Sequence, residues 1–156
     1  MRYLALDLGD KRTGLATGDS TMRLACPVGA INVPIDRDGG RALLDAIAAA
    51  VDEHLDSTGR IVVGLPLNMD GSEGPRARHV RAFADRISER TGRAIDLFDE
   101  RLTSAEADWR MGRSGLTRAQ KKRRRDALAA AAILTGFLAA IDRPPDAAGD
   151  EPGGFR

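Results

Sequence analysis

Cysteine, histidine and aromatic side chains are all scarce in this 156-residue sequence. The single cysteine, Cys26, excludes an internal disulfide, and one cysteine with two histidines does not form the spacing of a zinc site. Aromatic residues make up 4% of the chain, so base stacking of the kind used by single-strand binding proteins has little to work with. No apolar run is long enough for a membrane span or a secretory signal, and we therefore expect a cytoplasmic protein without a membrane partner.

The sequence does contain enough apolar material for one packed core. Hydrophobic residues make up 42% of the chain, and the length corresponds to about one domain. The last residues, "RPPDAAGDEPGGFR", are rich in proline, glycine and acid, a composition typical of disorder. We predict one domain over residues 1–142 and a disordered tail over residues 143–156.

Hydrophobic periodicity predicts an α/β fold. Two strands at residues 2–8 and 13–17, joined by the "GDKR" turn, and a third near residues 29–33 indicate antiparallel pairing at the start of the chain. Strands and helices then alternate: a helix at 41–55, a strand at 60–65, a helix from Pro75 to Gly92 and a strand at 94–100. Capping boxes at Thr103 and Thr117 predict two more helices, the second ending near residue 141. The result is a mixed sheet flanked by helices.

Three acidic residues stand in apolar or small surroundings. Asp7 interrupts a near-continuous apolar strand, Glu100 follows the last strand, and Asp126 shares a helix face with apolar residues. Carboxylates that converge at a sheet edge repel one another, and a pair of Mg²⁺ or Mn²⁺ ions would relieve the repulsion. Two such ions can activate water and stabilise the leaving oxygen of a phosphodiester.

Each acid also has a structural explanation. Asp7 can be a buried acid paired with Arg12 or with backbone donors. Glu100 can be a residue placed near a helix start, where negative charge is favourable. Asp126 can be a helix N-cap, although the capping box at Thr117 indicates that its helix begins earlier.

Positive charge is concentrated in residues 110–125, which hold eight basic and no acidic residues. Its core is the run Lys121, Lys122, Arg123, Arg124 and Arg125. Such a run is either a solvated helix face or a phosphate-binding element, and its position beside Asp126 favours the second interpretation. The loop "GLPLNMDGSEGP", with Asn68 near its centre, leads into a helix N-terminus suited to an anion, although an ordinary strand-to-helix turn has the same composition.

Four motifs together resemble one family. The segments "ALDLGDKRTGLATGD", "VVGLPLNMDGSEGP", "FDERLTSAEA" and "RRDALAAAAIL" stand in this order and at this spacing in the YqgF family, also called RuvX. Its members are named as pre-16S rRNA nucleases and were once described as Holliday junction resolvases. The resemblance covers about residues 2–141 and implies a ribonuclease H-like fold with a five-stranded sheet. It also implies a metal-dependent nuclease that matures the 5′ end of 16S rRNA.

The resemblance also implies site residues. The acidic triad of the family falls on Asp7, Glu100 and Asp126, which would hold the metal ions. Arg12, Asn68 and Arg101 match further motif positions, and we expect them to bind nucleic acid together with the basic run. Ser104 and Thr135 depart from the usual threonine and glutamine without affecting the triad.

Three other functions remain open at this point. The protein can be a nuclease of branched DNA, for which a symmetric junction requires a homodimer rather than a monomer. It can be a non-catalytic RNA-binding module of ribosome assembly. In either ribosomal role, precursor particles of the ribosome are a candidate partner. Finally, "LDLGDKRTG" resembles the phosphate loop of sugar-kinase and actin-like ATPases, although the chain is short for their two domains.

Overall fold

The computed structural model describes residues 1–103 and 117–141, which form an α/β fold around one five-stranded sheet. The sheet order is β3-β2-β1-β4-β5. Its strands are β1 (Arg2–Leu8), β2 (Thr13–Asp19), β3 (Leu24–Ile31), β4 (Arg60–Leu65) and β5 (Ile95–Asp99). β1 pairs antiparallel with β2, and β2 with β3, while β4 and β5 are parallel to β1. The predicted mixed sheet is confirmed.

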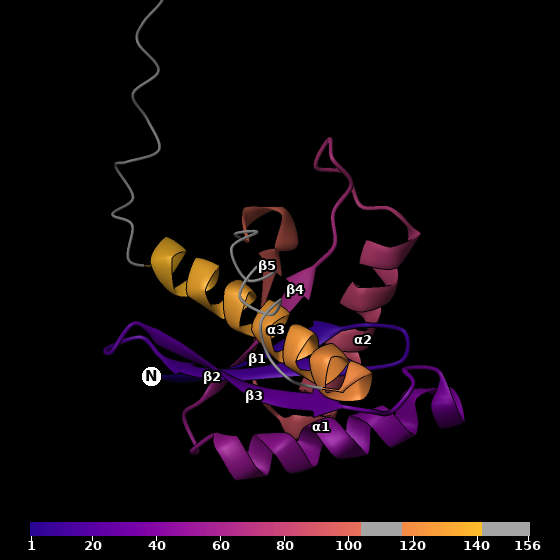
Figure 1. Cartoon of the computed structure of the whole chain (residues 1–156), viewed down its shortest axis with the longest axis horizontal. Helices are drawn as coiled ribbons and strands as arrows, with labels where there is room; N and C mark the ends of the chain where they lie inside the picture. The colour runs from indigo at the N-terminus through magenta and orange to yellow at the C-terminus, as the bar shows by residue number, and fades with distance from the viewer. Residues whose placement is uncertain (104–116, 142–156) are drawn as a thin grey trace, which may run out of the picture.

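Helices cover both faces of this sheet (Figure 1). They are α1 (Arg41–His54), α2 (Pro75–Thr91) and α3 (Arg118–Ile141), with short 3₁₀ turns η1 (Arg37–Gly40) and η2 (Glu100–Leu102). α3 crosses one face over β1, β2 and β3, while α1 and α2 pack against each other on the opposite face. None of the helices described is long and apolar enough to cross a membrane.

Each face has its own hydrophobic core. Under α1 and α2 the core consists mainly of leucine, isoleucine and valine, among them Leu4, Leu6, Leu43, Ile47, Ile61 and Val63. Under α3 it contains several alanines together with Tyr3, Phe98 and Phe137. Alternation along β1 explains this division, since successive side chains of a strand point to opposite faces.

Local sequence signals set most helix boundaries. Pro75 occupies the first turn of α2, and Gly92 ends the helix in the left-handed region with a φ of 69°. At the start of α3, the Thr117 hydroxyl accepts a hydrogen bond from the Gln120 amide, and the Gln120 side chain accepts one from the Thr117 amide. The predicted capping box and helix are confirmed.

β3 is the element whose position was wrong in the prediction. It runs over Leu24–Ile31 rather than near residues 29–33, and it is an edge strand with many exposed residues. An edge strand pairs on one side only and buries little, so its hydrophobic pattern is weak. Cys26 lies exposed on this strand.

The helix predicted from the capping box at Thr103 and the predicted tail at 143–156 lie outside the described residues.

Candidate active site

The candidate site is built around Asp7, close to the carboxyl end of β1. Asp7 pairs with Gly14 of β2, and on the β4 side Gly64 directly follows Val63, the last β4 residue paired with β1. Directly opposed residues of adjacent strands point to the same face, so the Asp7 side chain lies on the α3 face between two positions without side chains. This gap in the sheet surface receives groups from β5 and α3.

Glu100 enters the gap from the end of β5. It begins η2, directly after the strand, and a Cβ placed on Gly64 would lie 2.7 Å from Glu100 Oε1. The same Cβ would lie 2.5 Å from Ile133 Cδ1 of α3. Glycine at position 64 is therefore what allows the Glu100 carboxyl and α3 to approach the sheet beside Asp7.

Asp126 enters from the opposite side on α3. A Cβ on Gly14 would lie 1.9 Å from the backbone oxygen of Asp126, so no other residue fits between β2 and this turn of the helix. The Asp126 carboxylate accepts a hydrogen bond from Arg12 Nε, with 2.7 Å between Nε and Oδ2. Three carboxylates and one guanidinium from distant parts of the chain thus meet at one end of the α3 face.

Burial and mutual repulsion change the acidity of this site. Burial raises the pKa of Asp7, and the negative charge of Asp126 raises it further, while a hydrogen bond with Glu100 and the positive charge of Arg76 act in the opposite direction. Burial, the charge of Asp7 and the hydrogen bond with Asp7 raise the pKa of Glu100 to about 7. With a pKa of about 7, Glu100 is only partly ionised at neutral pH.

Arg76 is a site residue that the sequence interpretation missed. It lies in the first turn of α2, where Nη2 donates to the Leu8 carbonyl at 3.5 Å and Nη1 lies 3.6 Å from Asp10 Oδ1. Its positive charge lowers the pKa of both Asp7 and Glu100. The sequence feature that could have identified Arg76 is its position at a helix N-terminus, directly after a glycine-containing loop and Pro75.

Asn68 and Arg101 lie in or beside the loop between β4 and α2. The Asn68 side chain donates to Ser72 Oγ at 3.0 Å. Arg101 binds Asp99, with its closest contact of 2.7 Å between Nη2 and Oδ2, and donates from Nη1 to the Met69 carbonyl at 3.1 Å. In the structure both side chains stabilise this loop, and their contact with nucleic acid stays a prediction.

The five basic residues of the run lie in the first turns of α3 and are exposed. No ion pair joins them to an acidic residue in the two described segments. Asp126 follows the run directly, so α3 carries both the positive charge and one carboxylate of the site.

Among the residues that the structure describes, no group of three or more histidine, cysteine or acidic side chains is arranged to hold a metal ion. The Asp126 carboxylate faces Arg12 in this arrangement, while Asp7 and Glu100 form the close pair.

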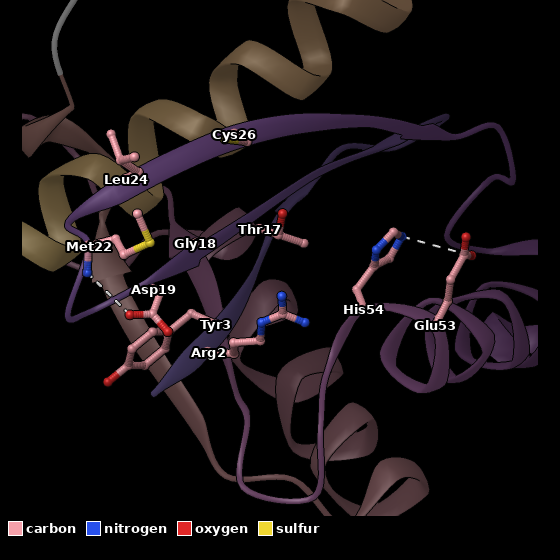
Figure 2. Close-up of a pocket in the computed structure, with 10 residues that line it drawn as sticks. All are labelled: Arg2, Tyr3, Thr17, Gly18, Asp19, Met22, Leu24, Cys26, Glu53 and His54. Carbon is pink, nitrogen blue, oxygen red and sulfur yellow. Dashed lines mark hydrogen bonds and ion pairs between the residues drawn. The ribbon is translucent and has the colours of Figure 1, made fainter.

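A separate pocket of about 310 Å³ lies at the other end of the sheet (Figure 2). It is lined by the start of β1, the end of β2 and the last residues of α1, including Glu53 and His54. Figure 2 shows His54 turned toward Glu53, and their side chains lie 3.8 Å apart. The pocket contains none of the predicted site residues.

The fold has a counterpart among solved structures. Over 90% of this chain and 95% of the other, the structure superposes on T. thermophilus RuvC in complex with a Holliday junction substrate, with a TM-score of 0.51 and 14% identity. At this identity the likeness concerns the fold alone. It places the chain in the class of α/β proteins with the ribonuclease H-like fold.

Sequence comparison gives the family. A family described as "RuvX: Holliday junction resolvase" matches residues 1–140, and the chain belongs to this family. A relative from Anaeromyxobacter sp. (strain Fw109-5), named "Putative pre-16S rRNA nuclease", is 46% identical over 88% of this chain and 96% of its own length. A relative of the same name from Myxococcus xanthus (strain DK1622) is 40% identical over 94% and 92%. The two descriptions differ in the nucleic acid and agree on a nuclease.

Proposed function

We propose that this protein is a metal-dependent nuclease that hydrolyses phosphodiester bonds and takes part in processing the 5′ end of pre-16S rRNA. The observation that carries the proposal is the close pair of half-buried carboxyls, Asp7 and Glu100, with the turn of α3 that carries Asp126 packed against Gly14 beside Asp7. Unpaired buried charge is costly, so a fold retains such a cluster only where a cation or a proton balances it. The family and the names of its relatives support the same chemistry.

The donor set fits a hard divalent cation. Asp7, Glu100 and Asp126 offer only carboxylate oxygens, which Mg²⁺ and Mn²⁺ prefer, and a positive ion would relieve the repulsion that raises the pKa of Glu100. Two bound ions supply an activated water and charge stabilisation at the leaving oxygen of the phosphodiester. For Asp126 to join the other two carboxylates, Arg12 must release it.

Arg12 and the basic run have the role of binding the nucleic acid backbone. A phosphate that approaches the carboxylates brings its own negative charge, and Arg12 is placed to exchange Asp126 for a phosphate oxygen. Lys121, Lys122, Arg123, Arg124 and Arg125 add sequence-independent attraction along α3. Asn68 and Arg101 hold the adjacent loop in the shape that faces the bound strand.

The relatives' names support precursor rRNA as the substrate. We therefore propose that the protein acts in the cytoplasm and that ribosomal precursor particles are its partner. We assign this activity to residues 1–142 as one domain, acting as a monomer or homodimer. A resolvase-like activity on branched DNA is the second candidate, because the family description and the RuvC fold point to it.

The decisive experiment compares purified wild-type protein with Asp7→Asn on precursor 16S rRNA and on a branched DNA junction, each with Mg²⁺, Mn²⁺ or EDTA. We expect metal-dependent shortening of the RNA by the wild type. Asp7→Asn should lower the rate by at least about a hundredfold, since the proposed metal site loses a charged ligand, while RNA affinity is retained. Asp52→Asn, an exposed acid on α1, is the matched control and should cleave normally.

Full activity of Asp7→Asn would refute the assigned role of this carboxylate. Metal-dependent cleavage of the junction in preference to the RNA would favour the resolvase. RNA binding without any metal-dependent product would favour the non-catalytic module of ribosome assembly.

A further inference from the structure

A groove of about 530 Å³ lies between the start of α3 and the edge strand β3. One wall consists of residues 27–30 of β3, and the other of Gln120, Arg123, Arg124 and Ala127 of α3. These α3 positions recur at helical spacing, so they form one face of the helix. The groove therefore uses two of the five cations in the basic run, whereas Lys121, Lys122 and Arg125 do not line it.

The groove combines positive charge with an apolar wall. In the described part of the chain, Arg123 and Arg124 have neither an ion pair nor a side-chain hydrogen bond, and no acidic residue lines the groove. The β3 wall consists of Pro27, Val28, Gly29 and Ala30, and Val28 is 42% exposed. Unpaired guanidiniums attract phosphates, and the apolar wall can cover sugar carbons.

The inner end of the groove lies close to the candidate active site. Ala30 pairs with Gly14, and Gly14 pairs with Asp7, so the three residues form one row across β3, β2 and β1. Two strand spacings correspond to about 10 Å. Ala127 on the opposite wall directly follows Asp126, whose backbone oxygen contacts the Gly14 position. A nucleic acid strand with a phosphate at Asp7 therefore reaches the groove within its neighbouring nucleotides.

We propose that this groove binds the sugar-phosphate backbone of a single-stranded segment next to the bond that is cleaved, with Arg123 and Arg124 on the phosphates and the 27–30 wall on the sugars. This inference rests on the nuclease function proposed above. A single strand is favoured over a duplex because the guanidiniums stand opposite an apolar wall, which can contact the sugars of one strand, and a duplex presents phosphates on a convex surface instead. None of the described residues that line the groove is aromatic, so we expect little base stacking there.

Binding in EDTA tests the proposal without cleavage. Fluorescence anisotropy would measure the affinity of the full chain for a single-stranded RNA and for a duplex of the same sequence over a range of salt concentrations. Arg123→Ala/Arg124→Ala should lose single-strand affinity about tenfold, with the salt slope reduced by about 1.4 for two phosphate contacts. Lys121→Ala/Lys122→Ala removes the same charge from the same helix and should lose clearly less single-strand affinity than the arginine double variant.

The apolar wall gives a second, independent pair of variants. Val28→Glu and Leu24→Glu each add one negative charge at an exposed apolar position of β3, but only Val28 lines the groove. We expect Val28→Glu to weaken single-strand binding several-fold and Leu24→Glu to have little effect. Circular dichroism melts of all variants confirm that each is folded.

Two results would overturn the groove assignment. One is an equal loss of single-strand affinity in the arginine double variant and in the lysine double variant, and the other is normal single-strand binding by Val28→Glu. A larger loss for the duplex than for the single strand would overturn it as well. These outcomes are distinct from failure of the proposed function, which is measured as cleavage by the wild type and by Asp7→Asn in the presence of metal.

Discussion

The two faces of the sheet are built from different residues and serve different ends. Beneath α1 and α2 the core is made of branched aliphatic side chains, which bury much apolar area. Beneath α3 the core mixes several alanines with aromatic and aliphatic side chains, and glycine stands at positions 14 and 64, where the helix and Glu100 come closest. On the α3 face, the glycines allow the α3 backbone and the Glu100 side chain to come close to the sheet beside Asp7.

At its far end the α3 face compensates with aromatic packing. Phe137 contacts Tyr3 and Phe98 edge to face, with ring centroids 5.2 and 6.3 Å apart. These rings hold the second half of α3 on the sheet, while the first half carries the basic run and Asp126. One helix thus combines a half that packs on the sheet through aromatic rings with a half that carries the proposed site residues.

The strongest test of this contrast is Ile47→Ala on the α1 face. Ile47 is fully buried, so the substitution removes apolar contacts and leaves a cavity that should cost about 4 kcal/mol of unfolding free energy. Urea denaturation measures the loss. Because Ile47 lies across the sheet from the carboxylates, cleavage per folded molecule should be unchanged, and a matching loss of activity would contradict the division of roles.

Gly14→Ala tests the functional face. The new Cβ would meet the Asp126 backbone oxygen, so α3 must shift, at a cost of about 3 kcal/mol together with most of the cleavage activity. Gly29→Ala on the neighbouring strand is the matched stability control, since nothing lies within 4 Å of its Cβ position. Equal melting temperatures for the two variants would show that close approach at Gly14 is unimportant.

Glu100→Gln should stabilise the metal-free protein. In the folded state the pKa of Glu100, about 7, lies above its ordinary value. The stabilisation of the folded state by protonated Glu100 is therefore fully present below pH 4.5 and is lost as the pH rises through 7. In EDTA at pH 8 we expect the variant to gain about 2 kcal/mol over the wild type, and at pH 4.5 almost nothing. It should also lose cleavage activity.

Urea denaturation at the two pH values measures this gain. Glu89→Gln, at an exposed position of α2, is the matched control. A gain by Glu100→Gln that does not depend on pH would show that repulsion between the carboxyls is not its source.

Phe137→Leu has the smallest expected effect. Loss of the two edge-to-face contacts should cost about 1 kcal/mol, because leucine still fills part of the space. Thermal denaturation measures it, and RNA affinity should stay unchanged. A loss of RNA binding would mean that the two halves of α3 are not independent.

The candidate site was predictable where local surroundings were unusual. Asp7 interrupts an apolar strand, and Asp126 shares a helix face with Ala130 and Ile133, which are buried as the spacing indicated. Arg76 and the role of Gly14 were not predictable, because each depends on contact between segments far apart in the sequence. The ion pair of Arg12 was not predictable for the same reason. Arg12 binds Asp126, which is 114 residues away in the sequence, rather than Asp7.

Sequence alone determined the order of strands and helices, the ends of α2 and α3 and the acidic positions of interest, because periodicity, capping and misplaced charge act over a few residues. Tertiary structure decided which of these groups meet. Only the pairing of β1 with β2 and β4 aligns Gly14 and Gly64 with Asp7, and only the packing of α3 brings Asp126 to Arg12 and a groove to β3. The physical reason is that distance in space between side chains is set by strand register and helix packing, which no local pattern encodes.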